Sequence, residues 1–252
     1  MNRKIAILTG ASRGLGKNAA LHLAKKGVDL IITYHSQADE AEKVVAEIEG
    51  LGTKAVALKL DVSQSNTFAA FAEQVQSVLQ SKWQRTSFDY LVNNAGTGIN
   101  VPFTETSEAQ FDMMMNIHLK GVYFLTQKLV GLMEDGGSIV NISSGLARFT
   151  FPGYSAYAIM KGAVETLSRY LAKELGARGI RVNTLAPGAI ETDFGGGAVR
   201  DNKELNQHIA SLTALGRVGV PDDIGGVIAS ILSEDTRWVN GQRIEAAGGI
   251  FL

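Results

Sequence analysis

The chain has 252 residues, 45% of them hydrophobic, and 24 basic side chains against 25 acidic ones give it a formal net charge of −1. This length and apolar content suit one α/β domain with a sizeable core, and the near-neutral charge argues against nucleic acid or an anionic membrane as a partner. Cysteine is missing from the sequence, which excludes disulfides, thiolate metal ligands and a cysteine nucleophile and fits a reducing compartment.

The N-terminal apolar run covers only residues 5–8 before Thr9-Gly10. That is too short for the core of a signal peptide, and no apolar run in the sequence approaches the ~20 residues of a membrane span. We therefore expect a soluble, cytoplasmic protein.

The first predicted strand is this same run, 5–8, which is continuously apolar as expected of a strand buried on both faces. A glycine loop of spacing G-x-x-x-G-x-G follows at 10–16, and a helix is predicted over 17–26, stopped by Gly27. Glycines allow the backbone to approach a pyrophosphate closely, and a helix N-terminus presents unpaired N–H groups to it. The order strand, glycine loop, helix thus predicts a dinucleotide site.

A second buried strand is predicted at 30–33, and its end should lie near the adenosine ribose of a dinucleotide. Enzymes that use NAD usually carry an acidic residue there, but this chain reads Tyr34-His35-Ser36. Without a carboxylate to repel a 2′-phosphate, and with Arg13 available as a cation, NADP(H) is favoured over NAD(H). The alternative is that Arg13 is an ordinary solvated arginine.

Strands and helices continue to alternate along the chain, and each strand ends in a polar or glycine residue. Such alternation predicts right-handed crossovers and a single Rossmann-like domain over 1–252, with a doubly wound parallel sheet of about seven strands and helices on both faces. Ligands bind at the carboxyl ends of strands in such sheets, where Gly10, Tyr34, Asp61 and Asn93 all fall. The further predicted segments are helices at 39–50 and 65–80, strands at 55–58 and 90–92, and a polar connector at 81–87.

Tyr157 and Lys161 are four residues apart in a helix predicted over 156–177, so their side chains should share one face. A nearby cation favours a phenolate and lowers the pKa of tyrosine from about 10, which makes it a usable general acid/base. Taken alone, this spacing also occurs by chance on exposed helix surfaces.

These motifs together resemble those of the short-chain dehydrogenase/reductase family over nearly the whole chain. Residues 9–16 resemble its TGxxxGxG loop, 93–96 its NNAG turn, and Ser144 falls thirteen residues before Tyr157, where the family has its catalytic serine. The resemblance implies hydride transfer between a nicotinamide and a carbonyl or secondary alcohol of a small molecule, with Tyr157 as acid/base. The implied catalytic residues are Ser144, Tyr157, Lys161 and His118, and the implied cofactor contacts are Gly10, Ser12, Arg13, Gly14, Leu15, Gly16, His35, Ser36, Asp61, Val62, Asn93, Ala95, Gly96, Tyr157, Lys161, Pro187, Gly188, Ile190 and Thr192.

His118 stands where the family usually has a catalytic asparagine, and Asn116 lies two residues earlier on another face of the helix. The asparagine's contribution in the family resembles that of a backbone carbonyl holding a water molecule, and a histidine supplies the same carbonyl. Our hypothesis is that His118 replaces the asparagine without loss of activity. A buried histidine satisfied by hydrogen bonds is compatible with this.

The irregular stretch 193–215 contains three consecutive glycines and a short amphipathic helix at 202–212, which suggests a lid over the substrate. The candidate pocket walls are aromatic and suit an apolar carbonyl compound. Within the family the nearest resemblance is to 3-oxoacyl-[acyl-carrier-protein] reductases, whose acidic partner needs basic docking residues. Glu134-Asp135 have the wrong sign for this, and Arg178 is the remaining positive candidate nearby. The wall residues are Phe149, Phe151, Tyr154 and Phe194.

In the family, helices equivalent to 109–133 and 156–177 pack across a dimer axis, and the C-terminal tail helps to build a tetramer. The tail here, 248–252, is apolar, so we expect a homotetramer, with a dimer second. An alternative function is a non-catalytic NADP(H) sensor, because fold alone does not imply turnover. The four histidines are scattered, and no metal site is predicted.

Overall fold

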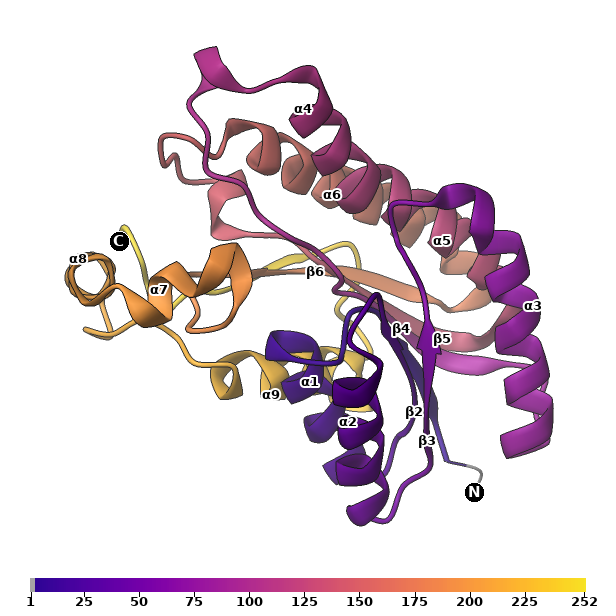
Figure 1. Ribbon diagram of the computed structural model, residues 1–252. Helices are drawn as coiled ribbons and strands as arrows, with labels where there is room; N and C mark the ends of the chain where they lie inside the picture. The colour runs from indigo at the N-terminus through magenta and orange to yellow at the C-terminus, as the bar shows by residue number, and fades with distance from the viewer. Residues whose placement is uncertain (1–2) are drawn as a thin grey trace.

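The computed structural model describes residues 3–252, and this part of the chain contains one sheet of seven strands, all parallel, in the order β3-β2-β1-β4-β5-β6-β7 (Figure 1). The order reverses between β1 and β4, as in a doubly wound sheet. The predicted fold class is therefore confirmed. The strands are β1 Ile5–Leu8, β2 Asp29–Tyr34, β3 Ala55–Lys59, β4 Phe88–Asn93, β5 Met133–Ile142, β6 Arg181–Pro187 and β7 Arg243–Ala246.

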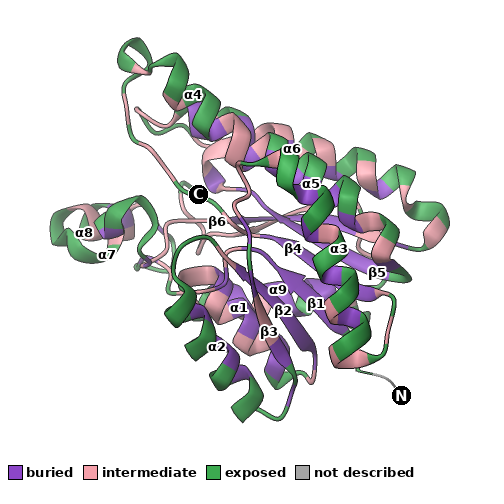
Figure 2. Cartoon of the chain, turned by 45° about the vertical axis from the view of Figure 1, so that its right-hand side comes forward, coloured by how far each residue is buried: buried purple, intermediate pink, exposed green. Residues whose placement is uncertain are grey.

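Helices cover both faces of this sheet and bury two separate apolar clusters against it. One face packs against α1, α2 and α9, and the other against α3, α5 and α6 (Figure 1). Figure 2 shows the consequence, buried strands between helices whose outer faces are exposed. The helices are α1 Gly14–Lys25, α2 Ala38–Gly50, α3 Phe68–Val78, α4 Glu108–Met115, α5 Gly121–Leu129, α6 Ser155–Glu174, α7 Ala198–Asp201, α8 Lys203–Ser211 and α9 Asp222–Leu232.

The strands follow from the sequence because both faces of the sheet are covered. All four residues of β1 have no exposed surface, which matches its uninterrupted apolar run. No helix within residues 3–252 has the length and apolarity needed to cross a membrane.

The segment predicted as one helix over 109–133 is helical from 108 to 132 but not uniform. A π-helical turn at Asn116–Lys120 separates α4 from α5, and a 3₁₀ turn at Val130–Leu132 ends the run before β5. A π-helical turn inserts an extra residue into a helix, and such turns occur often at functional sites. The segment predicted as one helix over 65–80 is likewise not uniform, because α3 is flanked by a 3₁₀ turn and by a second π-helical turn at Leu79–Trp83.

Gly121 follows the first π-helical turn and lets α5 lie directly against the loop after β3. A Cβ at this position would overlap the carbonyl oxygen of Val62 and approach that of Asn116 to 2.9 Å. Both neighbours are backbone atoms, which cannot turn aside as a flexible side chain can. The close approach therefore requires glycine.

We predict that Gly121→Ala destabilises the protein by about 1–3 kcal/mol through this overlap. Gly162→Ala is the matched control, because Gly162 lies inside α6 with no atom within 4 Å of its added Cβ. The control should be neutral or stabilising by up to about 1 kcal/mol, since alanine is the better helix former. Denaturant unfolding of both variants measures the difference, and equal effects would contradict the packing argument.

Candidate active site

The turn after β1 and the first turn of α1 form a cradle for an anion. Gly10 and Gly14 have φ of +66° and +56°, in the left-handed region that favours glycine. No side chain among residues 3–252 caps the N-terminus of α1, and its first turn holds no acidic residue. The helix N-terminus therefore offers N–H groups and positive potential to a phosphate. Ser12, Arg13, Leu15 and Gly16 lie in the same loop and first turn.

Hydrogen bonds tie this loop to the turn that follows β4. The Thr9 hydroxyl oxygen accepts from the backbone N–H groups of Asn94 and Ala95, at 2.9 and 3.0 Å. The Asn94 side-chain amide donates to the carbonyl oxygens of Thr9 and Gly10, at 2.8 and 3.0 Å. The two turns thus form one rigid unit. The sequence analysis did not assign this positioning role to Thr9 or Asn94, although the Asn-Asn doublet was a signal for it.

Asn93, a predicted cofactor contact, directs its side chain elsewhere. Its amide donates to Thr126 Oγ1 and Asn141 Oδ1, at 2.9 and 2.8 Å, and Asn141 in turn donates to Ser168 Oγ. Asn93 is only 5% exposed. Its side chain therefore serves an interior network that links β4, β5, α5 and α6, and a role toward a ligand would fall to its backbone. Ala95 and Gly96 continue the turn toward the surface.

At the end of β2, His35 and Ser36 are exposed, as the NADP(H) prediction requires. The His35 Nε2 atom lies 3.5 Å from a carboxylate oxygen of Asp61, and Val62 follows Asp61 in the loop after β3. Arg13 is also largely exposed, but its guanidinium lies 3.7 Å from the carboxylate of Asp193. In this state Arg13 thus pairs with the first residue of the predicted lid, a contact that sequence reasoning missed.

Tyr157 and Lys161 lie one turn apart on α6, as predicted, and both are buried, with exposures of 6% and 4%. The Lys161 ammonium donates to the carbonyl oxygen of Ile142 at 2.8 Å and lies 5.5 Å from the centroid of the Tyr157 ring. Ser144 is the second residue after β5, and its side chain interacts with the Tyr157 hydroxyl. The structure therefore brings these three predicted residues together at the carboxyl edge of the sheet.

The electrostatics of this group differ from the expectation that Lys161 lowers the pKa of the phenol. Burial raises the pKa of Tyr157 above its usual value, and the opposing hydrogen bond with Ser144 is the smaller effect. Burial also lowers the pKa of Lys161 to about 7. Because burial disfavours the charged form of Tyr157, its phenol keeps its proton in the free protein.

His118 packs its ring edge-on against Tyr157, with the centroids 5.0 Å apart and the planes at 88°. Its Nε2 atom lies 2.6 Å from the carbonyl oxygen of Thr97, so this nitrogen carries the proton and donates it. Its Nδ1 atom is buried and finds no partner among residues 3–252. Burial, and next the charge of Lys161, hold the pKa of His118 well below its usual value, so the ring is neutral.

Two neighbouring polar residues have structural positions. Ser143 donates to Glu165 at 2.7 Å and to the carbonyl oxygen of Lys161 at 3.3 Å, which joins the end of β5 to α6. Asn116 opens the π-helical turn whose middle residue is His118.

The chain from Pro187 to Phe194 leads from β6 past the glycine loop to the predicted lid. Gly188 packs on Ala247, Ile190 pairs with Gly219, and the methyl group of Thr192 faces Gly14. The Phe194 ring lies 5.7 Å from that of Tyr157 and directly against Gly98. The predicted lid contains a 3₁₀ turn at Phe194–Gly197, α7 and α8, where the sequence predicted one helix over 202–212.

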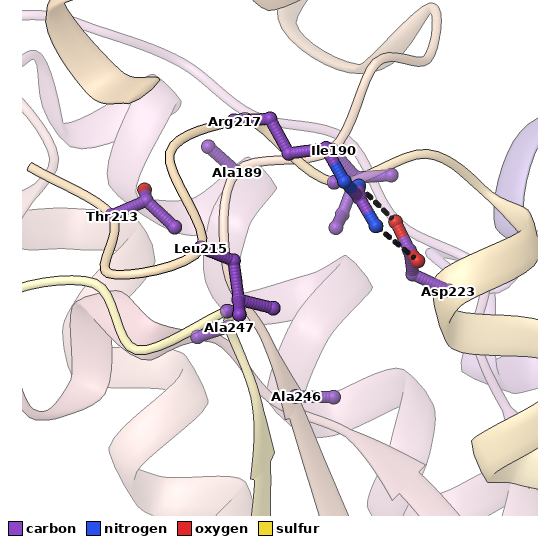
Figure 3. A pocket seen from close by; sticks show the side chains of 10 residues that line it. Ala189, Ile190, Thr213, Leu215, Arg217, Asp223, Ala246 and Ala247 are labelled. Carbon is purple, nitrogen blue, oxygen red and sulfur yellow. Dashed lines mark hydrogen bonds and ion pairs between the residues drawn. The ribbon is translucent and has the colours of Figure 1, made fainter. Parts of the chain in front are cut away.

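A separate cavity of about 200 Å³ lies between the end of the lid and the ends of β6 and β7 (Figure 3). Neither Ser144 nor Tyr157 lines it. Arg217 and Asp223 form a two-pronged ion pair on its wall, at 2.6 and 2.8 Å, so its charged groups are already satisfied. It is lined by Ala189, Ile190, Thr213, Leu215, Arg217, Gly219, Asp223, Ala246, Ala247 and Gly248.

Comparison with known proteins gives consistent matches over the whole chain. Residues 10–250 match the family model described as enoyl-(acyl carrier protein) reductase. A hydroxynaphthalene reductase-like protein of Metarhizium brunneum is 36% identical, over 98% of this chain and 94% of its own. The crystal structure of an angucycline C-6 ketoreductase with bound NADP superposes with a TM-score of 0.93 at 35% identity, covering 98% and 95%. A short-chain dehydrogenase/reductase from Serratia marcescens gives 0.91 at 30% identity, covering 99% and 98%.

We predict that Lys161→Met flattens the dependence of stability on pH in the protein without cofactor. Burial lowers the pKa of Lys161 from 10.5 to about 7, so the unfolded state binds one more proton between these values. Stability should therefore rise with pH in this window, by up to about 1.4 kcal/mol per pH unit. Tyr157 adds nothing to this pH dependence below about pH 9, because its phenol is protonated in both the folded and the unfolded state.

Denaturant unfolding between about pH 7 and pH 9 measures this slope. Lys173→Met is the matched control, since it removes an exposed lysine from the same helix. Equal slopes for the wild type and Lys161→Met would show that Lys161 is charged in the folded protein.

Proposed function

The chain belongs to the short-chain dehydrogenase/reductase family, and from this membership we propose that it is an NADP(H)-dependent oxidoreductase that reduces a carbonyl group, with Tyr157 as the general acid. The observation that carries the proposal is the grouping of Ser144 with the buried Tyr157 and Lys161 at the carboxyl edge of the sheet. A sensor without turnover has no use for such a group, and the relatives are named as reductases. The enzymatic interpretation is therefore favoured over the sensor.

The described residues fit NADP(H). The uncapped N-terminus of α1 and the left-handed glycines suit a pyrophosphate, and no acidic residue at the end of β2 opposes a 2′-phosphate. An angucycline ketoreductase of the same fold was solved with NADP bound. We propose that Arg13 leaves Asp193 to pair with the 2′-phosphate, together with His35 and Ser36. The nicotinamide of the bound cofactor supplies the hydride.

In the proposed reaction the chain's own residues handle the oxygen of the substrate. Ser144 donates a hydrogen bond to the carbonyl oxygen, and Tyr157 gives its proton to the oxygen as negative charge develops there. Lys161, held by the carbonyl oxygen of Ile142, stabilises the phenolate that remains. Each such role typically lowers the barrier by about 2 to 4 kcal/mol.

We propose that His118 acts through its backbone and its packing rather than by proton transfer. Its ring is neutral, and its protonated nitrogen is already engaged by Thr97. The π-helical turn places an irregular stretch of backbone at this position, which supports the hypothesis that the His118 carbonyl takes over the role of the usual asparagine.

We propose a ketone on a fused aromatic ring system as the substrate class. The relatives are named for the reduction of hydroxynaphthalenes and of an angucycline. Two aromatic contacts are in keeping with this: the Phe194 ring lies 5.7 Å from that of Tyr157, and the rings of Phe151 and Tyr154, a few residues before Tyr157, lie 6.3 Å apart. Stacking on such rings would hold a flat apolar molecule. The segment 193–215 is proposed as the lid.

An acyl carrier protein is not proposed as a partner. Arg178, the positive candidate near the strand that leads to Ser144, is paired with Asp135 at 2.7 Å and also donates to the carbonyl oxygen of Val130. It therefore offers little free positive charge to an acidic surface.

We propose a homotetramer, with a dimer as the second choice, and a cytoplasmic location as predicted from the sequence. The oligomer is supported by large apolar side chains that remain exposed on the layer of α4, α5 and α6 and in the C-terminal tail. They are Phe111, Met113, Tyr123, Phe124, Ile159, Tyr170 and Leu252.

NADPH oxidation with a fused-ring ketone such as 2-tetralone should be lost in Tyr157→Phe by about 10²-fold or more, since the variant lacks the acidic proton. Tyr170→Phe, an exposed tyrosine on the same helix, is the matched control and should keep full activity. NADH should be used less well than NADPH. Equal turnover of 2-tetralone by Tyr157→Phe would remove Tyr157 from the mechanism, and a preference for NADH would overturn the proposed role of Arg13.

His118→Asn should change kcat by less than a few-fold, because asparagine provides the same backbone carbonyl and the imidazole is not proposed to carry a proton. The same NADPH assay measures it. A much larger loss, with unchanged thermal stability, would show that the side chain has a role of its own.

A further inference from the structure

The C-terminal tail, Gly248 to Leu252, is fastened to the end of the lid. The backbone N–H groups of Ala214 and Leu215 donate to the carbonyl oxygens of Gly249 and Gly248, at 3.2 and 3.1 Å. In return the N–H group of Phe251 donates to the carbonyl oxygen of Leu212 at 2.9 Å. Figure 1 shows the C-terminus beside α7 and α8 accordingly. These three hydrogen bonds therefore join the backbone of the C-terminal tail to the backbone at the end of the lid.

Phe251 has an unusual conformation within this tail. Its φ is +58°, and among the non-glycine residues from 3 to 252 only Gln84 shares the left-handed region. A residue with a Cβ adopts this conformation at a cost, so its surroundings must hold it there. The hydrogen bond to Leu212 is one such restraint. The result is a ring directed back toward the carboxyl edge of the sheet rather than along the tail.

The Phe251 ring meets Phe149, with the centroids 5.2 Å apart and the planes tilted by 49°. Phe149 belongs to the turn that begins at Ser144: its N–H group donates to the carbonyl oxygen of Gly145 at 2.9 Å. The Arg148 guanidinium lies 5.2 Å from the centroid of the same ring and is anchored on Glu245 at 3.0 Å. The turn that begins at Ser144 thus holds Phe149, and the hydrogen bond to Leu212 holds Phe251.

The rings of Phe149 and Phe251 contact each other, but both remain partly exposed to solvent. Phe251 is 40% exposed and Phe149, five residues after Ser144, is partly exposed. Two adjoining rings with open faces are suited to an aromatic ligand, because offset or tilted stacking stabilises such contacts beyond the burial of area.

We propose that Phe251 is a specificity-determining residue: with Phe149 it forms a wall on which the ring system of a fused aromatic ketone stacks while Ser144 and Tyr157 hold the carbonyl oxygen. This inference rests on the proposed function and goes beyond it by assigning the recognition of the rings to the C-terminal tail. A small ketone without an extended ring system does not reach the wall.

The test compares kcat/KM for 2-tetralone and for cyclohexanone, with NADPH, in the full chain. Phe251→Ala should lower the value for 2-tetralone about tenfold and that for cyclohexanone less than twofold, and Phe251→Tyr should restore it. Trp238→Ala, which removes an almost fully exposed aromatic ring elsewhere, is the matched control. Phe149→Ala together with Phe251→Ala should lose less than the product of the two single losses, since both remove the same wall.

An equal fall in kcat/KM for both ketones, or no fall in kcat/KM for 2-tetralone, would overturn the inference while leaving the proposed reductase activity intact. So would a changed oligomeric state of Phe251→Ala by gel filtration, because the ring would then belong to a subunit interface. If the wild type turns over neither ketone, the proposed function is at fault, and calorimetric binding of 2-tetralone to the NADP⁺ complex decides the inference separately. Weaker binding by Phe251→Ala supports it, and equal binding overturns it.

Discussion

The burial of Tyr157 and Lys161 on one face of α6 is the constraint on which the rest of the site depends. Removing an ammonium from water is expensive unless it is paired or gives up its proton, and Lys161 does both in part, through the carbonyl oxygen of Ile142 and a pKa near 7. This places α6 firmly against the end of β5. The same desolvation keeps the phenol protonated, which is the state that a proton donor needs.

Buried polar contacts concentrate at the carboxyl edge of the sheet, where they replace the apolar packing of its centre. Thr9 and Asn94 join the turns after β1 and β4, and Asn93 joins β4 to β5. Glu165 accepts from Ser143 and pairs with Arg243 of β7 at 2.7 Å. Such contacts are directional, so each turn keeps one arrangement. A cofactor and a substrate oxygen can then be positioned without reorganisation.

The residues proposed to recognise the substrate lie on different elements from the residues proposed to carry out the reaction. The residues proposed to act on the substrate oxygen, Ser144 and Tyr157, lie just after β5 and on α6, whereas the aromatic rings proposed to recognise the substrate lie on the predicted lid, on the turn after β5 and on the C-terminal tail. These segments have few buried apolar residues, and Phe194 and Phe251 are both about 40% exposed. Changes in such segments can alter substrate specificity without disturbing the residues proposed to transfer the proton.

Local pattern alone determined the alternating strands and helices, the glycine loop and the Tyr157–Lys161 spacing, because each depends on neighbours within a few residues. The family motifs then located most of the candidate site. Only the tertiary structure decided that Asn93 points inward, that Arg13 pairs with Asp193, and that Phe251 reaches Phe149. It also reversed the expected shift in the pKa of Tyr157, since burial is set by packing. These outcomes depend on contacts between residues up to 180 positions apart, which no local periodicity encodes.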